Sequence, residues 1–158
     1  MKAASVREID QELKRLPPAR LAELCTRLAR FKKENKELLT YLLFEADDLD
    51  AYIKNVREEM DEGFGEVNRT QLYQAKKTLR KILRSANKYI RYTGSKIAEV
   101  EILLHYCTNF KGLSLPYRKS PVLVNLYNAQ LKKVGSAIDS LHEDLQHEYL
   151  KSYNRLSL

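Results

Sequence analysis

The stretch from Val67 to Ala98 constrains the fold of this chain more than any other. It contains nine basic residues and no Asp or Glu. Its apolar residues, Leu72, Leu79 and Leu83 among them, recur at the three- and four-residue spacing of a helix. The basic residues fall on the opposite side of that helix. The sequence therefore predicts a long amphipathic helix over about residues 68–93, with a polar face of one charge sign.

Charge is unevenly distributed along the chain. The formal net charge is +7, yet residues 45–66 carry nine acidic and only two basic groups. Residues 1–44 have a net charge of +4, and residues 99–158 have +1. The positive excess therefore comes mainly from one predicted helix, which directly follows an acidic one.

The remaining composition favours an all-α fold. There are only five Gly and four Pro, and no short β-branched runs lie between turn residues. Ser5 and Glu8 have the spacing of a capping box and predict a first helix. Pro17 ends that helix, and Pro18 can begin a second one. A third helix, ending at Phe44, is apolar over most of its circumference, so we expect it at the centre of the fold.

Turn and cap residues predict where the later helices begin and end. Asp47 or Asp48 can cap an acidic helix, and Gly63-Phe64-Gly65 breaks its pattern. Asn68 is a candidate cap for the basic helix. Gly94 either ends the basic helix, with a cap at Ser95, or lies within a continuous rod.

The last third of the chain predicts one long helix after a loop. The loop runs from Gly112 to Pro121, and the helix runs from Val122 to about Tyr153. Gly135 is the weak point of this helix, because glycine costs about 1 kcal/mol relative to alanine inside a helix.

These elements predict six or seven antiparallel helices in a single domain, residues 1–158. Residues 1–62 would form short helix pairs, and residues 67–111 and 121–153 would form long helices. Two architectures fit: a closed helical bundle, or a short superhelix of the armadillo or HEAT type. The short helices favour the superhelix for the first half, and the long helices favour bundle packing after residue 67.

The cysteines and the hydropathy pattern predict a cytoplasmic protein. Cys25 and Cys107 lie within apolar helical patterns and lack the spacing of a zinc site, so we expect two buried thiols in a reducing compartment. No apolar run approaches the ~20 residues that span a bilayer, so we expect no membrane association. No motif indicates a cofactor.

Three further motifs were compared with known kinds of site. His142 and His147 are five residues apart, whereas the zinc-protease helix places its two histidines four apart. The acidic residues 45–50 lack the calcium-binding loop pattern, because Ile53 occupies the position of the required glycine. Gly63-Phe64-Gly65 lacks the lysine of phosphate loops. No catalytic constellation is recognisable, so we do not expect an enzyme.

The basic helix is the one candidate binding site. Arginine pairs with phosphate, and an aromatic ring can stack on a base. The candidate residues for binding nucleic acid or another polyanion are Tyr73, Lys77, Arg80, Arg84, Lys88 and Arg91. Two alternatives need no ligand: basic residues are common on exposed helices, and the preceding acidic helix could cover this charge.

Two stretches carry a family resemblance. The runs Leu79–Arg84 and Lys88–Lys96, together with Leu16-Pro17-Pro18 through Leu43, resemble an uncharacterised family of small all-helical bacterial proteins, over roughly residues 1–110. The resemblance implies a bacterial helical domain of unknown function and transfers no site residues. The helical architecture and the absence of a catalytic constellation lead us to expect a non-enzymatic interaction or scaffold module that binds a protein partner or a second copy of itself. The alternative is a nucleic-acid-binding module.

Overall fold

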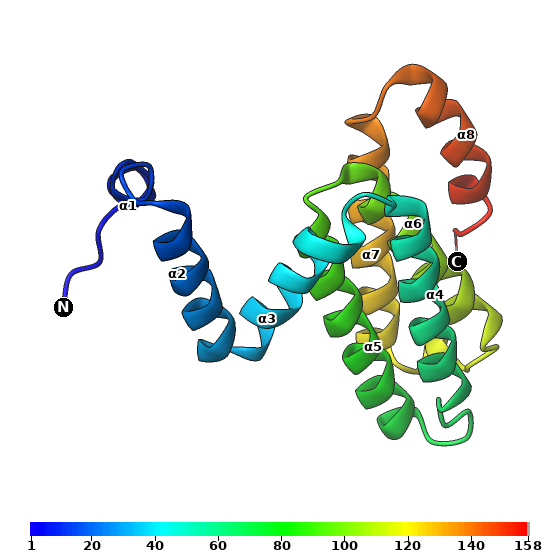
Figure 1. Ribbon diagram of the computed structural model, residues 1–158. Coiled ribbons are helices and arrows are strands. Elements are labelled where there is room, and N and C mark those ends of the chain that lie inside the picture. Colours follow the sequence, from blue (N-terminus) through cyan, green and yellow to red (C-terminus); the bar gives the residue numbers. More distant parts are fainter. Residues whose placement is uncertain (158) are drawn as a thin grey trace. The chain divides into compact units, whose positions relative to one another are not determined.

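The computed structural model describes residues 1–157, which form eight α-helices, one π-helical turn and one 3-10 turn, with no strand (Figure 1). The predicted all-α class is confirmed, but the count of six or seven is wrong. The predicted final helix is two helices, α7 (Pro121–Asp139) and α8 (Glu143–Asn154). The side chain of Gln146 stabilises the break between them, because its Nε2 donates to the carbonyl oxygens of Asp139 and Leu141 at 3.1 and 2.8 Å.

The chain divides into two compact units, residues 1–44 and residues 45–158, here called the N-terminal and C-terminal units. The N-terminal unit contains α1 (Val6–Leu13), α2 (Pro18–Phe31) and α3 (Lys33–Thr40). The predicted capping box is present, since the Ser5 hydroxyl accepts from the Glu8 amide and the Glu8 carboxylate accepts from the Ser5 amide. That residues 1–158 fold as a single domain stays a prediction.

The third helix is not central, contrary to expectation. No residue of α1, α2 or α3 is fully buried. The apolar residues that follow α3 lie on the π-helical turn Tyr41–Glu45, where Leu42, Leu43 and Phe44 are 56%, 62% and 78% exposed. Three short helices are too few to surround any one of them, so several of their large apolar side chains stay exposed.

The core of the C-terminal unit forms around α6 (Lys96–Gly112). This helix packs against α4 (Leu49–Gly65), α5 (Leu72–Thr93), α7 and α8 (Figure 1). Its buried residues cover most of its circumference: Ala98, Val100, Ile102, Leu103, Leu104, Tyr106, Cys107 and Phe110. A helix that is apolar over most of its circumference needs neighbours on most sides, and α6 has them.

Two boundaries differ from expectation. The acidic helix α4 continues through Gly63-Phe64-Gly65, because Phe64 is buried and Gly63 lets α5 approach closely. A Cβ atom at Gly63 would lie 2.9 Å from Cγ1 of Ile82. Asn68 does not cap α5. Its side chain accepts from the amides of Thr70 and Gln71 and forms a turn before the helix begins.

Two predicted caps are confirmed. The Asp48 carboxylate accepts from the Ala51 amide at 3.0 Å and begins α4. Gly94 has φ +59° and ends α5, and the Ser95 hydroxyl accepts from the Ala98 amide to begin α6. Of the two alternatives for Gly94, the chain therefore adopts the break, and glycine tolerates this left-handed conformation at little cost.

The two thiols differ. Cys107 is buried as predicted, and burial raises its pKa to about 12. Cys25 is exposed, so the prediction of a second buried thiol is wrong. The reason is again that the N-terminal unit has too few helices to cover it. Within residues 1–157, no helix combines the length and the apolar character needed to cross a bilayer.

Candidate interaction surfaces

Packing fixes which side of α5 faces solvent. Ala75, Leu79 and Ala86 are fully buried and lie on one side of the helix. The hydroxyl of Tyr106, on α6, donates to the carbonyl oxygen of Leu79 at 3.1 Å and anchors this side. The opposite side, which carries the basic residues, is therefore turned outward.

The structure brings the six candidate residues together on that outward side, here called the basic face: Tyr73, Lys77, Arg80, Arg84, Lys88 and Arg91. All are exposed except Lys88, which is half-buried with its ammonium 4.8 Å from the ring centroid of Tyr89. From Lys77 to Arg91 the cations extend over about 21 Å of helix, at 1.5 Å per residue. Their arrangement is a row along one helix.

Four cations of the basic face are not neutralised by the protein. Among the described residues, no acidic group forms an ion pair with Lys77, Arg80, Arg84 or Arg91. Three acids of α4 have other partners, because Asp61 accepts from His105, Glu59 accepts from Tyr89 and Glu58 pairs with Lys54. This row therefore presents positive charge to solvent.

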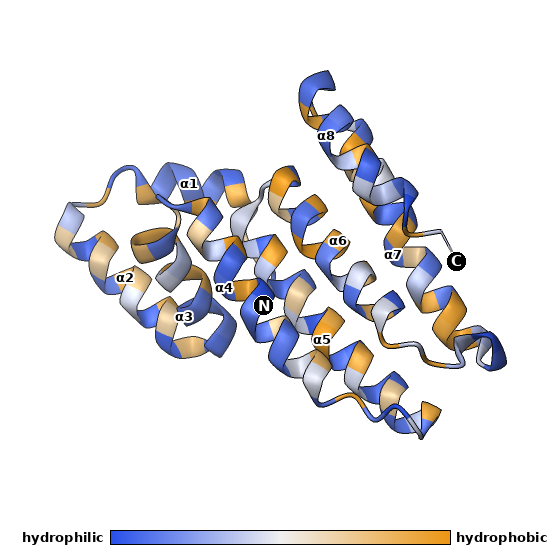
Figure 2. Cartoon of the chain, turned by 90° about the vertical axis from the view of Figure 1, so that its right-hand side faces the viewer, coloured by the Kyte–Doolittle hydropathy of each residue, from blue (hydrophilic) through white to orange (hydrophobic). Residues whose placement is uncertain are grey.

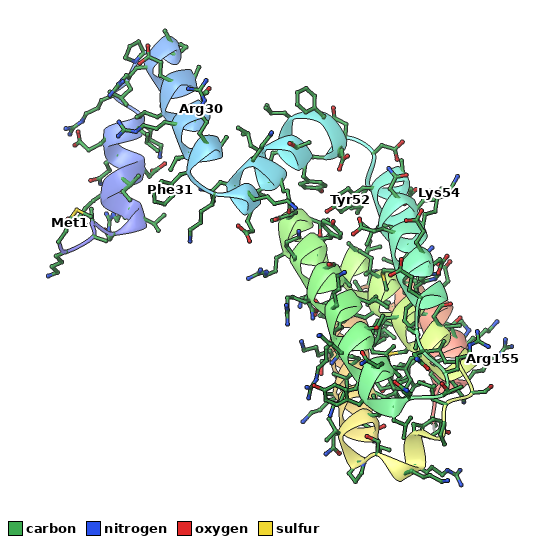
Figure 3. All side chains as sticks on the ribbon, turned by 90° about the horizontal axis from the view of Figure 1, so that it is seen from below. Met1, Arg30, Phe31, Tyr52, Lys54 and Arg155 are labelled. Atoms are coloured by element: carbon green, nitrogen blue, oxygen red, sulfur yellow. The ribbon has the colours of Figure 1, made fainter. Side chains whose placement is uncertain are left out.

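The acidic helix covers only one edge of α5. Asp61 accepts from His105 at 2.6 Å, on α6, and Glu58 pairs with Lys54 of its own helix at 3.9 Å. Lys54 points away from the rest of the unit in Figure 3. Glu59 reaches α5, but it accepts from the hydroxyl of Tyr89 at 3.0 Å.

A groove of about 210 Å³ lies between α4 and α5 at this edge. Its charged lining consists of Glu59, Glu62 and Glu66 on one side and Lys81 on the other. The masking of the basic helix that we considered from the sequence is therefore confined to the edge that contains Lys81.

Aromatic rings lie at the ends of the basic face. Tyr73 is 70% exposed, and the ammonium of Lys76 lies 5.5 Å from its ring centroid. Tyr92, at the other end, is half-buried beside Tyr89, with ring centroids 6.3 Å apart. Of these rings Tyr73 is the most open to a stacking partner.

The N-terminal unit carries a second surface, which sequence reasoning missed because it placed these residues in a core. A groove of about 230 Å³ lies between α2 and α3 and is almost wholly apolar. We call it the apolar groove, and it is lined by Cys25, Leu28, Ala29, Asn35, Leu38, Leu39 and Leu42. Its one polar side chain, Asn35, already donates to the carbonyl oxygen of Leu28 at 2.9 Å.

Large apolar side chains are exposed in the lining of the apolar groove and elsewhere on α2. Leu28 is 60% exposed, and Phe31, at the end of α2 (Figure 3), is 77% exposed. Hydrophobic and hydrophilic residues alternate along α2 and α3 in Figure 2, as expected for amphipathic helices. Apolar surface gathered in one place typically marks a binding site in a soluble domain.

A polar network links three helices of the C-terminal unit. Glu101, on α6, accepts from Arg57 at 2.8 Å and from the hydroxyl of Tyr149 at 2.7 Å. Burial and the neighbouring Glu101 carboxylate raise the pKa of Tyr149 above its ordinary value. The sequence signal for this network was Glu101, an acid that lies between the apolar residues Val100 and Ile102 of α6. Its partners come from α4 and α8, so it ties helices together and lies apart from both surfaces.

The motifs compared with metal sites have structural roles. His142 precedes α8, where its Nδ1 accepts from the amide of Asp144 at 3.4 Å. Asp48 caps α4, as described above. Over residues 1–157, no three His, Cys, Asp or Glu side chains come close enough together to hold a metal ion.

Comparisons with known proteins add no relative. No protein-family model, no curated protein and no solved structure matches this chain. The resemblance to a family of helical bacterial proteins therefore stays a prediction.

Proposed function

We propose that this chain is a helical interaction module that binds a protein partner, or a second copy of itself, through the apolar groove of the N-terminal unit. One observation carries the proposal: α1, α2 and α3 leave several large apolar side chains exposed, namely Val6, Ile9, Leu28, Phe31 and Leu38. Burying a leucine or phenylalanine contributes about 1.5–3 kcal/mol, so a partner that covers several of them gains substantial affinity.

The groove suits an amphipathic helix as the bound element. Such a helix places apolar side chains three and four residues apart into a hydrophobic groove. Leucines line both sides of the groove, with Leu28 on α2, Leu38 on α3 and Leu42 on the π-helical turn that follows α3. In the C-terminal unit, the packing of four helices around α6 supports a helical bundle as the architecture.

The test compares two double variants of the full chain. Leu28→Lys/Leu42→Lys places charges in the groove, whereas Thr26→Lys/Thr40→Lys adds the same charges at exposed positions of α2 and α3 that do not line it. We would measure molar mass by light scattering over a hundredfold range of concentration, and capture of proteins by each variant. Self-association or capture that only the groove variant loses supports the proposal. Identical behaviour of both variants contradicts it.

We propose polyanion binding, with nucleic acid as the ligand, as a second function. The observation that favours it is the row of four cations on α5 that form no ion pair within the described structure. Each phosphate neutralised on a single strand contributes about −0.7 to the slope of log K against log salt concentration. Four contacts therefore predict a slope near −2.8, or about a 50-fold loss of affinity between 50 and 200 mM salt.

Fluorescence anisotropy with labelled single- and double-stranded oligonucleotides tests this second function. Arg80→Glu/Arg84→Glu should abolish binding, while Lys132→Glu/Lys151→Glu, which makes the same charge change on α7 and α8, should retain it. Equal binding by the two variants would show that net charge alone attracts the oligonucleotide and would refute a site on α5.

A further inference from the structure

A hollow beside the α5–α6 turn extends the basic face onto two other helices. Its volume is about 630 Å³, and it is open to solvent. Its polar lining comes from Asn87 and Arg91 on α5, Ser95, Lys96 and Glu99 around the start of α6, and Lys133 on α7.

The charges in this hollow do not balance. Glu99 is its one acidic lining residue, and its carboxylate pairs with Lys96 at 2.7 Å. Arg91 and Lys133 form no ion pair with any described residue, so two cations remain uncompensated. A concave surface lined by one sign of charge concentrates counterions of the other sign.

The neutral groups provide a donor beside these cations. The side-chain amide of Asn87 forms no hydrogen bond with the described residues and lines the same hollow. The hydroxyl of Ser95 is engaged in the cap of α6, so it is the less available of the two. An arginine, a lysine and an amide donor around one hollow suit a phosphate group, whose oxygens accept several hydrogen bonds.

Arg91 belongs both to the basic face and to the hollow, so the two surfaces are continuous. We infer that the hollow binds a phosphate group of a nucleic-acid strand that lies along the basic face, held by Arg91, Lys133 and the Asn87 amide. The inference rests on the second proposed function. It adds two residues to the candidate set: Asn87, which lies on α5 itself, and Lys133, on α7, which no pattern in the sequence connected with α5.

The test uses neighbouring lysines as a matched pair. Lys132 and Lys133 are both exposed on α7, but only Lys133 lines the hollow. With a labelled single-stranded 20-mer, Lys133→Gln should make the slope of log K against log salt less steep by about 0.7, the value for one phosphate. Lys132→Gln should leave the slope unchanged.

Failure of the inference and failure of the proposed function give different results. If Arg80→Glu/Arg84→Glu abolishes binding but Lys133→Gln keeps the wild-type slope, the basic face binds nucleic acid and the hollow does not. If the wild type binds no oligonucleotide, both are refuted.

A local measurement identifies the source of the phosphate. The side-chain amide signal of Asn87 should shift when the 20-mer is added, and the shift should be absent in Lys133→Gln. Saturation of the same shift by millimolar inorganic phosphate alone, with no response to the 20-mer, would assign the hollow to a free anion and overturn the inference.

Discussion

Gly63 allows the acidic helix and the basic helix to approach each other, and replacing it with alanine tests that packing. A Cβ atom there would lie 2.9 Å from Cγ1 and 3.3 Å from Cδ1 of Ile82. Ile82 is buried, and Cγ1 is attached directly to the branched Cβ, so it has little freedom to move away. Gly65, two residues further on, has no described atom within 4 Å of the same position.

Two opposing contributions determine the result. Replacing glycine with alanine inside a helix stabilises it by about 1 kcal/mol. Overpacking a core typically costs about 1–3 kcal/mol. We therefore expect Gly63→Ala to lower the free energy of unfolding by about 1 kcal/mol, since these values leave a net cost of between about 0 and 2 kcal/mol. Gly65→Ala should raise it by up to about 1 kcal/mol, since only the helix preference changes.

Urea unfolding followed by circular dichroism measures both variants. A third measurement isolates the contact: in an Ile82→Ala background, which removes the clashing carbons, Gly63→Ala should become stabilising. If Gly63→Ala stabilises the wild type as much as Gly65→Ala does, the close approach of α4 and α5 at this point is not a constraint, and our account of why α4 continues through Gly63 is wrong.

Three further results are expected. Burial raises the pKa of Cys107 to about 12, so only about one Cys107 thiol in ten thousand is ionised at pH 8. A maleimide should therefore label Cys25 alone in the native protein, and Cys107 should become labelled only when urea unfolds the chain. Tyr149→Phe should lower the free energy of unfolding by about 1–2 kcal/mol, measured in urea, because it removes a hydrogen bond to a carboxylate. Hydrogen bonds from the side chain and the backbone of Ser5 hold the pKa of Glu8 below its ordinary value of 4.5. The capping contribution to α1 should therefore be complete above pH 4.5 and disappear as pH falls through the lowered pKa, which backbone chemical shifts of residues 6–9 would record.

Local signals in the sequence predicted much of the secondary structure. Capping residues such as Ser5, Asp48 and Ser95 act on the next three or four residues, so their effect can be read without knowing the fold. The break between α7 and α8 was missed for the opposite reason. Apolar periodicity continues across it, and the break depends on Gln146 reaching back to carbonyl oxygens before the helix.

Burial was predicted less well than helix position. The leucines near Leu42 and those of α6 look alike in sequence, yet the first group is exposed and the second is enclosed. What differs is the number of helices available to surround each one, which is a property of the whole unit. Similarly, charge alone was enough to identify the basic face of α5 from the sequence. Lys133 could be assigned to the same surface only from the structure, in which it lines a hollow together with residues at the end of α5.

The enclosure of α6 also bears on how the chain folds during synthesis. Two of its covering helices, α4 and α5, precede it, whereas α7 and α8 follow it. When α6 has just emerged from the ribosome, the apolar side facing α7 is therefore bare. At 5–20 residues per second, synthesis from Leu113 to Asp139 takes about 1–5 s, and during that interval a nascent chain exposes a continuous apolar helix that a chaperone could bind.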